Sequence, residues 1–203
     1  MTDGDPTLVT GLLRAARAGD ASAFDQALPL VYEELHRIAR RLRHGWSGSD
    51  TLNTTALVHE AYVKLAGAGA HDFHDRVHFM AVAATAMRHI LIDYARSRQT
   101  AKRGGAARIV DLAEIEASLA GDTGFSDTKA ASLLALDRAL LRLAEHSERQ
   151  VHIVECRFFA GMTIPETAVA LGISPATVKR GWAMAQAWLY RELMVAGIPE
   201  ETP

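Results

Sequence analysis

Basic side chains that could bind a polyanion are concentrated in one part of this 203-residue sequence, although its formal net charge is only −2. Positions 34–108 hold twelve lysines and arginines against six aspartates and glutamates. Positions 111–137 hold six acids and one lysine. This asymmetry indicates a polyanionic partner for one part of the chain only.

A second set of side chains suited to DNA lies just after Pro175 and comprises Ala176, Thr177, Lys179 and Arg180. Arginine can bind guanine through two hydrogen bonds, and threonine can offer a hydroxyl or a methyl group to a base edge. Such contacts need a helix whose first turns enter the major groove. We therefore predict that these four residues contact duplex DNA.

Cap residues define the two helices that must position this set. Thr163 and Glu166 have the spacing of a capping box, which begins a helix, and Gly172 suits the left-handed residue that ends it. Ser174 and Pro175 then supply an N-cap and a first helical position. The inward face of the second helix is predicted to comprise Val178, Trp182, Ala185 and Leu189, and the small Ala168 of the first helix lies where the two must approach closely. This is helix-turn-helix geometry, and an αα-hairpin with a purely structural role is the alternative.

Apolar spacing predicts helices in the N-terminal part as well. We expect a short helix over residues 8–18 that is broken at Gly19, and a longer one capped by Asp20. Pro29 should kink or restart that longer helix, and His44–Asp50 has the composition of a loop. A helix over residues 54–66 should bury Leu57, Ala61 and Leu65, and one from about Asp75 should bury Phe79, Val82, Ala86 and Ile90.

Two further helices are expected between about Lys129 and Phe159, and Gly161 ends the second. No stretch alternates with period two long enough to predict a strand. The fold class is therefore all-α, with two small helical domains, 1–103 and 129–203, of which the second contains the helix-turn-helix. Residues 104–128 are acidic and weakly periodic, so we interpret them as a flexible linker, with a short helix over 112–119.

The remaining chemistry-bearing residues do not predict an enzyme. A cluster of possible metal ligands comprises His71, Asp72, His74, Asp75 and His78. It straddles a loop and a helix start, and no other cluster completes a ligand set, so we predict no metal. Residues 59–63 lack the second histidine of a zincin motif. No phosphate-binding glycine loop or Ser-His-Asp arrangement is recognisable, and we expect no cofactor.

Composition favours a cytoplasmic protein that does not enter the membrane. No apolar run approaches the roughly 18 residues of a membrane span, and the N-terminus carries acids where a signal peptide would carry basic residues. The single cysteine, Cys156, suits a reducing compartment, and its apolar helical surroundings favour a packed thiol over a redox sensor.

Six motifs occur together in this chain: TALVHEAYVKL at 55–65, HFMAVAA at 78–84, MRHILIDYAR at 87–96, KRGG at 102–105, RFFAG at 157–161 and ATVKR at 176–180. In this order they resemble the extracytoplasmic-function (ECF) sigma factors of bacterial RNA polymerase, in particular the TALVHEAY branch. The resemblance covers nearly the whole chain, and it implies a sigma factor that directs core RNA polymerase to promoter DNA. It leaves open whether an anti-sigma factor binds.

The resemblance implies a role for each helical surface. The helix at 54–66 would dock on the largest polymerase subunit through Glu60, with His59 and Lys64 beside it. In most of the wider family an acid precedes the Leu-Val pair, where this chain has Ala56. The second domain would read the minus-thirty-five element, although its helix has Gly181 where family patterns often have an acid.

The helix at 76–96 and the loop before it would recognise and open the minus-ten element. Strand separation exposes bases, and proteins hold single strands with a basic groove and pockets for unstacked bases. A flipped base would be captured by Asp72, Phe73, His74 and Asp75. The strand backbone would be followed by Arg88, His89, Arg96, Arg98, Lys102 and Arg103.

Two other classes of protein stay open at this point. One is a stand-alone helix-turn-helix regulator whose N-terminal half binds a ligand or a dimer partner. The other is an anti-sigma-like adaptor that binds proteins only. The basic helix end at 96–103 argues against the first, and the exposed charges of Lys179 and Arg180 argue against the second.

Overall fold

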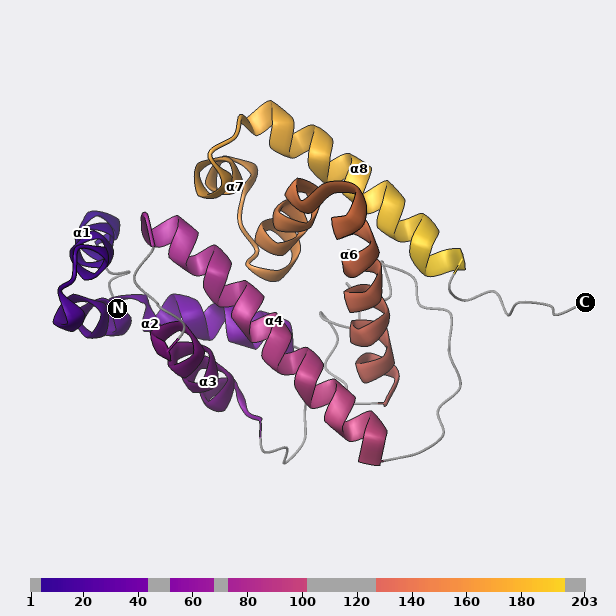
Figure 1. The fold of residues 1–203 in the computed structure, drawn as a ribbon, viewed down its shortest axis with the longest axis horizontal. Helices are drawn as coiled ribbons and strands as arrows, with labels where there is room; N and C mark the ends of the chain where they lie inside the picture. Colours follow the sequence, from indigo (N-terminus) through magenta and orange to yellow (C-terminus); the bar gives the residue numbers. More distant parts are fainter. Residues whose placement is uncertain (1–4, 44–51, 68–72, 102–126, 196–203) are drawn as a thin grey trace, which may run out of the picture.

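The computed structural model describes residues 5–43, 52–67, 73–101 and 127–195, and every regular element in these ranges is helical (Figure 1). The elements are α1 (Pro6–Arg17), α2 (Ala21–Arg43), α3 (Thr54–Gly67), α4 (Arg76–Ala101), α6 (Asp127–Val154), η1 (Glu155–Phe159), α7 (Ile164–Leu171) and α8 (Pro175–Val195). The all-α class is thereby confirmed. The predicted loop at 44–50 and nearly all of the predicted linker at 104–128, with its short helix, lie outside the described residues.

Short polar side chains begin the first four helices. Backbone N–H groups two or three positions further on donate to the side-chain oxygens of Asp5, Asp20, Asn53 and Asp75 at 2.8–3.0 Å. Each such bond satisfies a donor that has no partner inside the helix. Asp20 thus begins α2 as predicted, directly after Gly19 at φ 106°.

Pro29 does not restart α2, which continues unbroken to Arg43. A proline inside a helix removes one donor, and the acceptor left over is the carbonyl one turn earlier, here that of Asp25. Asp25 and Pro29 both lie on the exposed side of α2. Water can therefore satisfy the carbonyl, and the helix tolerates the proline.

The segment from 127 to 159 consists of two helices, as predicted. Ser147 interrupts α6 with φ −165° and ψ 98°, and its hydroxyl accepts a hydrogen bond from the backbone N–H of Gln150 at 3.3 Å. The second helix then passes into η1, a π-helical turn, and ends before Gly161 at φ 73°.

Helix α4 lies at the centre of the molecule, packed against α1–α3 of the N-terminal half and against α6, η1 and α7 of the C-terminal half, while α8 packs on α6 and α7 (Figure 1). Only part of its predicted inward face is buried: Val82 and Ala86 stay half-exposed. Met87 and Leu91, which were not in the predicted face, are completely enclosed. A helix that is apolar on several faces is typical of an enclosed position. The N-terminal and C-terminal halves of the chain therefore both pack against α4.

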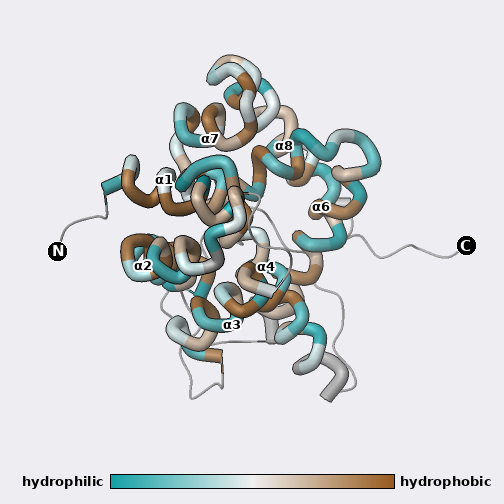
Figure 2. The backbone as a smooth tube through the Cα atoms, turned by 60° about the vertical axis from the view of Figure 1, so that its left-hand side comes forward, coloured by the Kyte–Doolittle hydropathy of each residue, from teal (hydrophilic) through white to brown (hydrophobic). Residues whose placement is uncertain are grey.

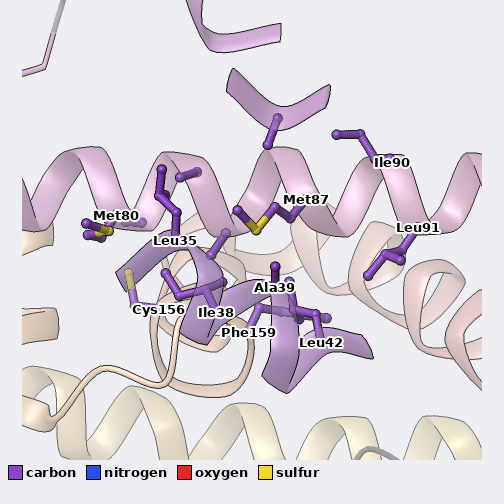
Figure 3. Packing of buried hydrophobic residues seen from close by; sticks show 14 of the residues in the cluster. Leu35, Ile38, Ala39, Leu42, Met80, Met87, Ile90, Leu91, Cys156 and Phe159 are labelled. Carbon is purple, nitrogen blue, oxygen red and sulfur yellow. The ribbon is translucent and has the colours of Figure 1, made fainter. Parts of the chain in front are cut away.

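One continuous hydrophobic core joins the two halves. Figure 3 shows Leu35 and Ile38 of α2, Met87 of α4 and Phe159 of η1 gathered in a single cluster. Along each helix in Figure 2, hydrophobic and hydrophilic residues alternate around the tube, as expected where only some faces pack. The predicted inward residues of α3 (Leu57, Ala61 and Leu65) belong to this core.

Candidate nucleic-acid interface

Helices α7 and α8 are present where their cap residues predict them, with residues 172–174 between them. The Thr163 hydroxyl accepts from the backbone N–H of Glu166 at 3.3 Å, and the Glu166 carboxylate accepts from that of Thr163 at 2.7 Å. These bonds from Thr163 hold the pKa of Glu166 below its ordinary value, because they stabilise the ionised carboxylate. Gly172 ends α7 in the left-handed region at φ 63°. The capping box and the glycine stop are both confirmed.

The residues predicted to contact duplex DNA occupy the first turns of α8. Ala176, Lys179 and Arg180 are exposed. Thr177 is half-buried, and its hydroxyl lies 2.8 Å from that of Ser174, which caps the helix. The two cations therefore project from the end of α8 that a groove-binding helix would present to base edges.

The inward face of α8 explains the glycine at position 181. Val178 and Ala185 are fully buried, as predicted, and Ala168 of α7 packs with Val178 and Ile153. A Cβ on Gly181 would lie 2.5 Å from Cδ1 of Ile153, which is itself fully buried. Gly181 thus permits a close approach of α8 to the second helix of α6, and a larger residue there would have to displace Ile153.

The residues before α4 are placed differently from one another. Phe73 is only 5% exposed and stacks against Phe24 with ring centroids 6.1 Å apart, so it is not presented to a flipped base. His74 is exposed, with its ring nitrogen 2.7 Å from the Arg17 guanidinium. Asp75 caps α4. The exposure expected for Phe73 is corrected here, because an aromatic ring gains more by packing in the core than by facing water.

Arg88 is also buried, contrary to the exposure that a phosphate contact requires. Its guanidinium donates to Asp137 at 2.8 Å and to Glu155 at 3.0 Å, and both carboxylates come from the C-terminal half of the chain. Arg96 is exposed and reaches Asp137 at 3.0 Å. His89 lies beside Arg88, and burial together with that neighbouring cation lowers the pKa of the imidazole.

Asp137 and Glu155 are the functional candidates that the sequence analysis missed. Each is buried, and each sits among apolar neighbours, Asp137 after Leu136 and Glu155 after Val154. An acid at an inward position of an apolar helix is rarely buried without a partner. That signal was available in the sequence, but the identity of the partner was not.

The three residues predicted to dock the polymerase line one groove between α3 and α4. His59, Glu60 and Lys64 are exposed along α3, and α4 contributes Ile90 and Tyr94 to the opposite wall. The groove has a volume of about 560 Å³. It offers both charges and apolar surface, including Val63 at 56% exposure, to a protein partner.

Ala56 occupies the third helical position of α3, where its backbone N–H donates to Asn53 at 2.8 Å. An acid at this position could also have closed a capping box. Alanine leaves the helix capped from one side only, and it supplies no negative charge to the first turn of α3.

Some predicted residues cannot be placed. Asp72, Lys102 and Arg103 lie outside the described residues, as does His71, and the side chain of Arg98 is not described although α4 includes it. Among the described residues, no group of three or more His, Cys, Asp or Glu is arranged to hold a metal, and no helix is long and apolar enough to cross a membrane. Cys156 is buried, and burial with the adjacent Glu155 raises its pKa to about 12.

The described residues form an all-α fold in which the exposed cations Lys179 and Arg180 lie on the first turns of α8. The profile of the ECF sigma factor family matches residues 6–195. The chain belongs to this family. It is therefore a sigma factor, which directs core RNA polymerase to promoters and initiates transcription.

Curated relatives agree with the family match. The ECF RNA polymerase sigma factor SigM of Mycobacterium tuberculosis, in strains Erdman and H37Rv, is 28% identical over 183 residues. That alignment covers 90% of this chain and 83% of the relative. The alternative of a stand-alone regulator is not favoured by these matches.

Proposed function

We propose that this sigma factor binds its partners through two separate surfaces. The α3–α4 groove docks the core polymerase, and the first turns of α8 read the minus-thirty-five element as duplex DNA. Figure 1 supports this division, because α3 packs directly on α4 whereas α8 lies beyond α6 and α7, away from α3. The observation that carries the proposal is the row His59, Glu60 and Lys64, exposed over a groove of mixed chemistry.

The minus-ten element is assigned to α4 and the residues before it. His74 and His89 are exposed and can reach a DNA strand from the surface. Arg96 is exposed as well, but its guanidinium pairs with Asp137. Arg88 can do so only after it leaves Asp137 and Glu155. The domains 1–103 and 129–203 would then act at two promoter elements, with 104–128 between them.

The motif TALVHEAY at residues 55–62 supports membership of the branch named after it. We place the protein in the cytoplasm, where its polymerase and DNA partners lie. An anti-sigma factor is a further candidate partner. The α3–α4 groove and the exposed first turns of α8 each present surface that such a protein could cover.

Replacing Glu60 tests the docking assignment. Glu60→Arg reverses an exposed charge, so the fold should lose no more than about 0.5 kcal/mol, while core binding and run-off transcription should fall sharply. Glu145→Arg reverses another exposed acid outside the groove and is the matched control. Normal core binding and transcription by Glu60→Arg would remove Glu60 from the interface. Tight, sequence-specific DNA binding by the wild-type chain alone would favour a stand-alone regulator.

A further inference from the structure

Three charged side chains hold the two halves of the chain together at α4. Arg88 is 6% exposed, and its two terminal nitrogens pair with Asp137 of α6 and Glu155 of η1. The second oxygen of Asp137 accepts from Arg96. The guanidinium carbon of Arg88 also lies 5.5 Å from the centre of the Phe159 ring. Apart from the adjacent His89 and Asp93, the partners of the two arginines named here come from the C-terminal half.

Carboxylates and DNA phosphates make the same demand on an arginine. Both accept two charge-assisted hydrogen bonds from the planar guanidinium fork. Asp137 and Glu155 therefore occupy the donors that Arg88 and Arg96 would offer to a nucleic-acid backbone. Because a buried charge without a counter-charge is costly, Arg88 cannot exchange partners while the halves stay packed.

We propose that Arg88, Asp137 and Glu155 form an intramolecular latch, which keeps the sigma factor closed and withholds Arg88 and Arg96 from DNA. The proposal rests on the proposed function, because it takes α4 to be the helix that follows the minus-ten strand. In the closed form the acids of the C-terminal half take the place of DNA phosphates. Opening separates the halves, exposes Arg88 and makes the strand-binding face of α4 complete.

The latch is tested by removing its negative charges and keeping its shape. The double variant Asp137→Asn with Glu155→Gln leaves Arg88 buried without a counter-charge, which favours the open form. The matched control is Glu145→Gln with Glu148→Gln, which removes two exposed acids of α6 and the same net charge. Circular dichroism checks that helix content is kept in each full-length chain.

The first measurement is the distance between the halves without DNA or polymerase. Spin labels on Glu33→Cys of α2 and Leu141→Cys of α6 sit at exposed positions, while Cys156 is buried and should not react. We expect one narrow distance distribution for the otherwise wild-type chain and for the control. The latch variant should give a broader and longer one, and an unchanged distribution would overturn the latch.

The second measurement is affinity for a mixed-sequence single-stranded DNA oligonucleotide. If nine-tenths of the wild-type chain is closed, opening should tighten binding by about tenfold. An equal gain in the control would mean that net charge alone acts, and would overturn gating by the latch. Should the double variant unfold, Glu155→Gln alone should show the same direction with a smaller change. Since the distances are measured without polymerase, they report on the latch even if the docking assignment fails.

Discussion

The two regions proposed to bring basic residues to DNA are built in opposite ways. On α8, Lys179 and Arg180 stand exposed on a helix whose caps and turn are supplied within a few residues. On α4, Arg88 is enclosed by acids that follow it by 49 and 67 positions in the chain. The comparison teaches that a locally capped unit presents its charges directly, whereas a central helix presents only those that its distant partners leave exposed.

The largest effect should come from breaking the buried pair on α4. Asp137→Ala leaves Arg88 with one carboxylate, and it should lower the free energy of unfolding by about 3–5 kcal/mol. Arg138→Ala, at the exposed neighbouring position, should change it by less than about 0.5 kcal/mol. Urea denaturation followed by circular dichroism measures both. Equal effects of the two variants would mean that the α4 cluster stabilises no more than a surface charge does.

On α8 the expected effect is on DNA binding, and stability should not change. Arg180→Ala should weaken promoter binding by about 1–3 kcal/mol and relax the preference at one base, as for a base-edge contact. Arg191→Ala removes an exposed arginine near the other end of the same helix and is the control. Binding of a promoter library to the holoenzyme measures both. A loss that is equal for all sequences would assign Arg180 to a phosphate instead.

Gly181 lies where the exposed and the buried faces of α8 meet, and it sharpens the comparison. Gly181→Ala gains about 1 kcal/mol of helix propensity, but crowding against Ile153 costs about 1–3 kcal/mol, so a net loss of stability is expected. In an Ile153→Val background the crowding methyl is absent, and the same substitution should be neutral or stabilising. Thermal unfolding of the wild type, Gly181→Ala, Ile153→Val and the double variant measures this double-mutant cycle. A loss of equal size in both backgrounds would contradict the close approach.

The smallest effect concerns the cap of α7. Thr163→Ala removes the hydroxyl acceptor and should cost about 1 kcal/mol, whereas Thr163→Ser should cost little. Because the pKa of Glu166 is lowered in the folded chain, its contribution is present at neutral pH and is lost as pH falls below the ordinary glutamate range. The difference in stability between wild type and Glu166→Gln should therefore shrink on acidification. Unfolding curves at neutral and acidic pH test this, and a constant difference would contradict it.

The sequence by itself determined the helical elements, α7 and α8 among them. Thr163 with Glu166, Gly172 and Ser174 with Pro175 act over a few residues, so their pattern was sufficient to predict both helices and the turn. The two helices between about Lys129 and Phe159 and the stop at Gly161 were likewise predicted from local signals. Of the kink or restart expected at Pro29, the restart did not occur, because the carbonyl that the proline leaves without a donor lies on the exposed side of α2.

Only the tertiary structure decided which charges of α4 are exposed. The sequence indicated Arg88, Arg96 and Phe73 as candidates for contacting the minus-ten element. It did not reveal that Arg88 pairs with Asp137 and Glu155 or that Phe73 stacks on Phe24. Burial depends on which residues pack together from distant parts of the chain, and a buried charge must find its counter-charge there. The fit of Gly181 against Ile153 was hidden for the same reason, because a sequence gives the size of a residue but not the neighbour that it must meet.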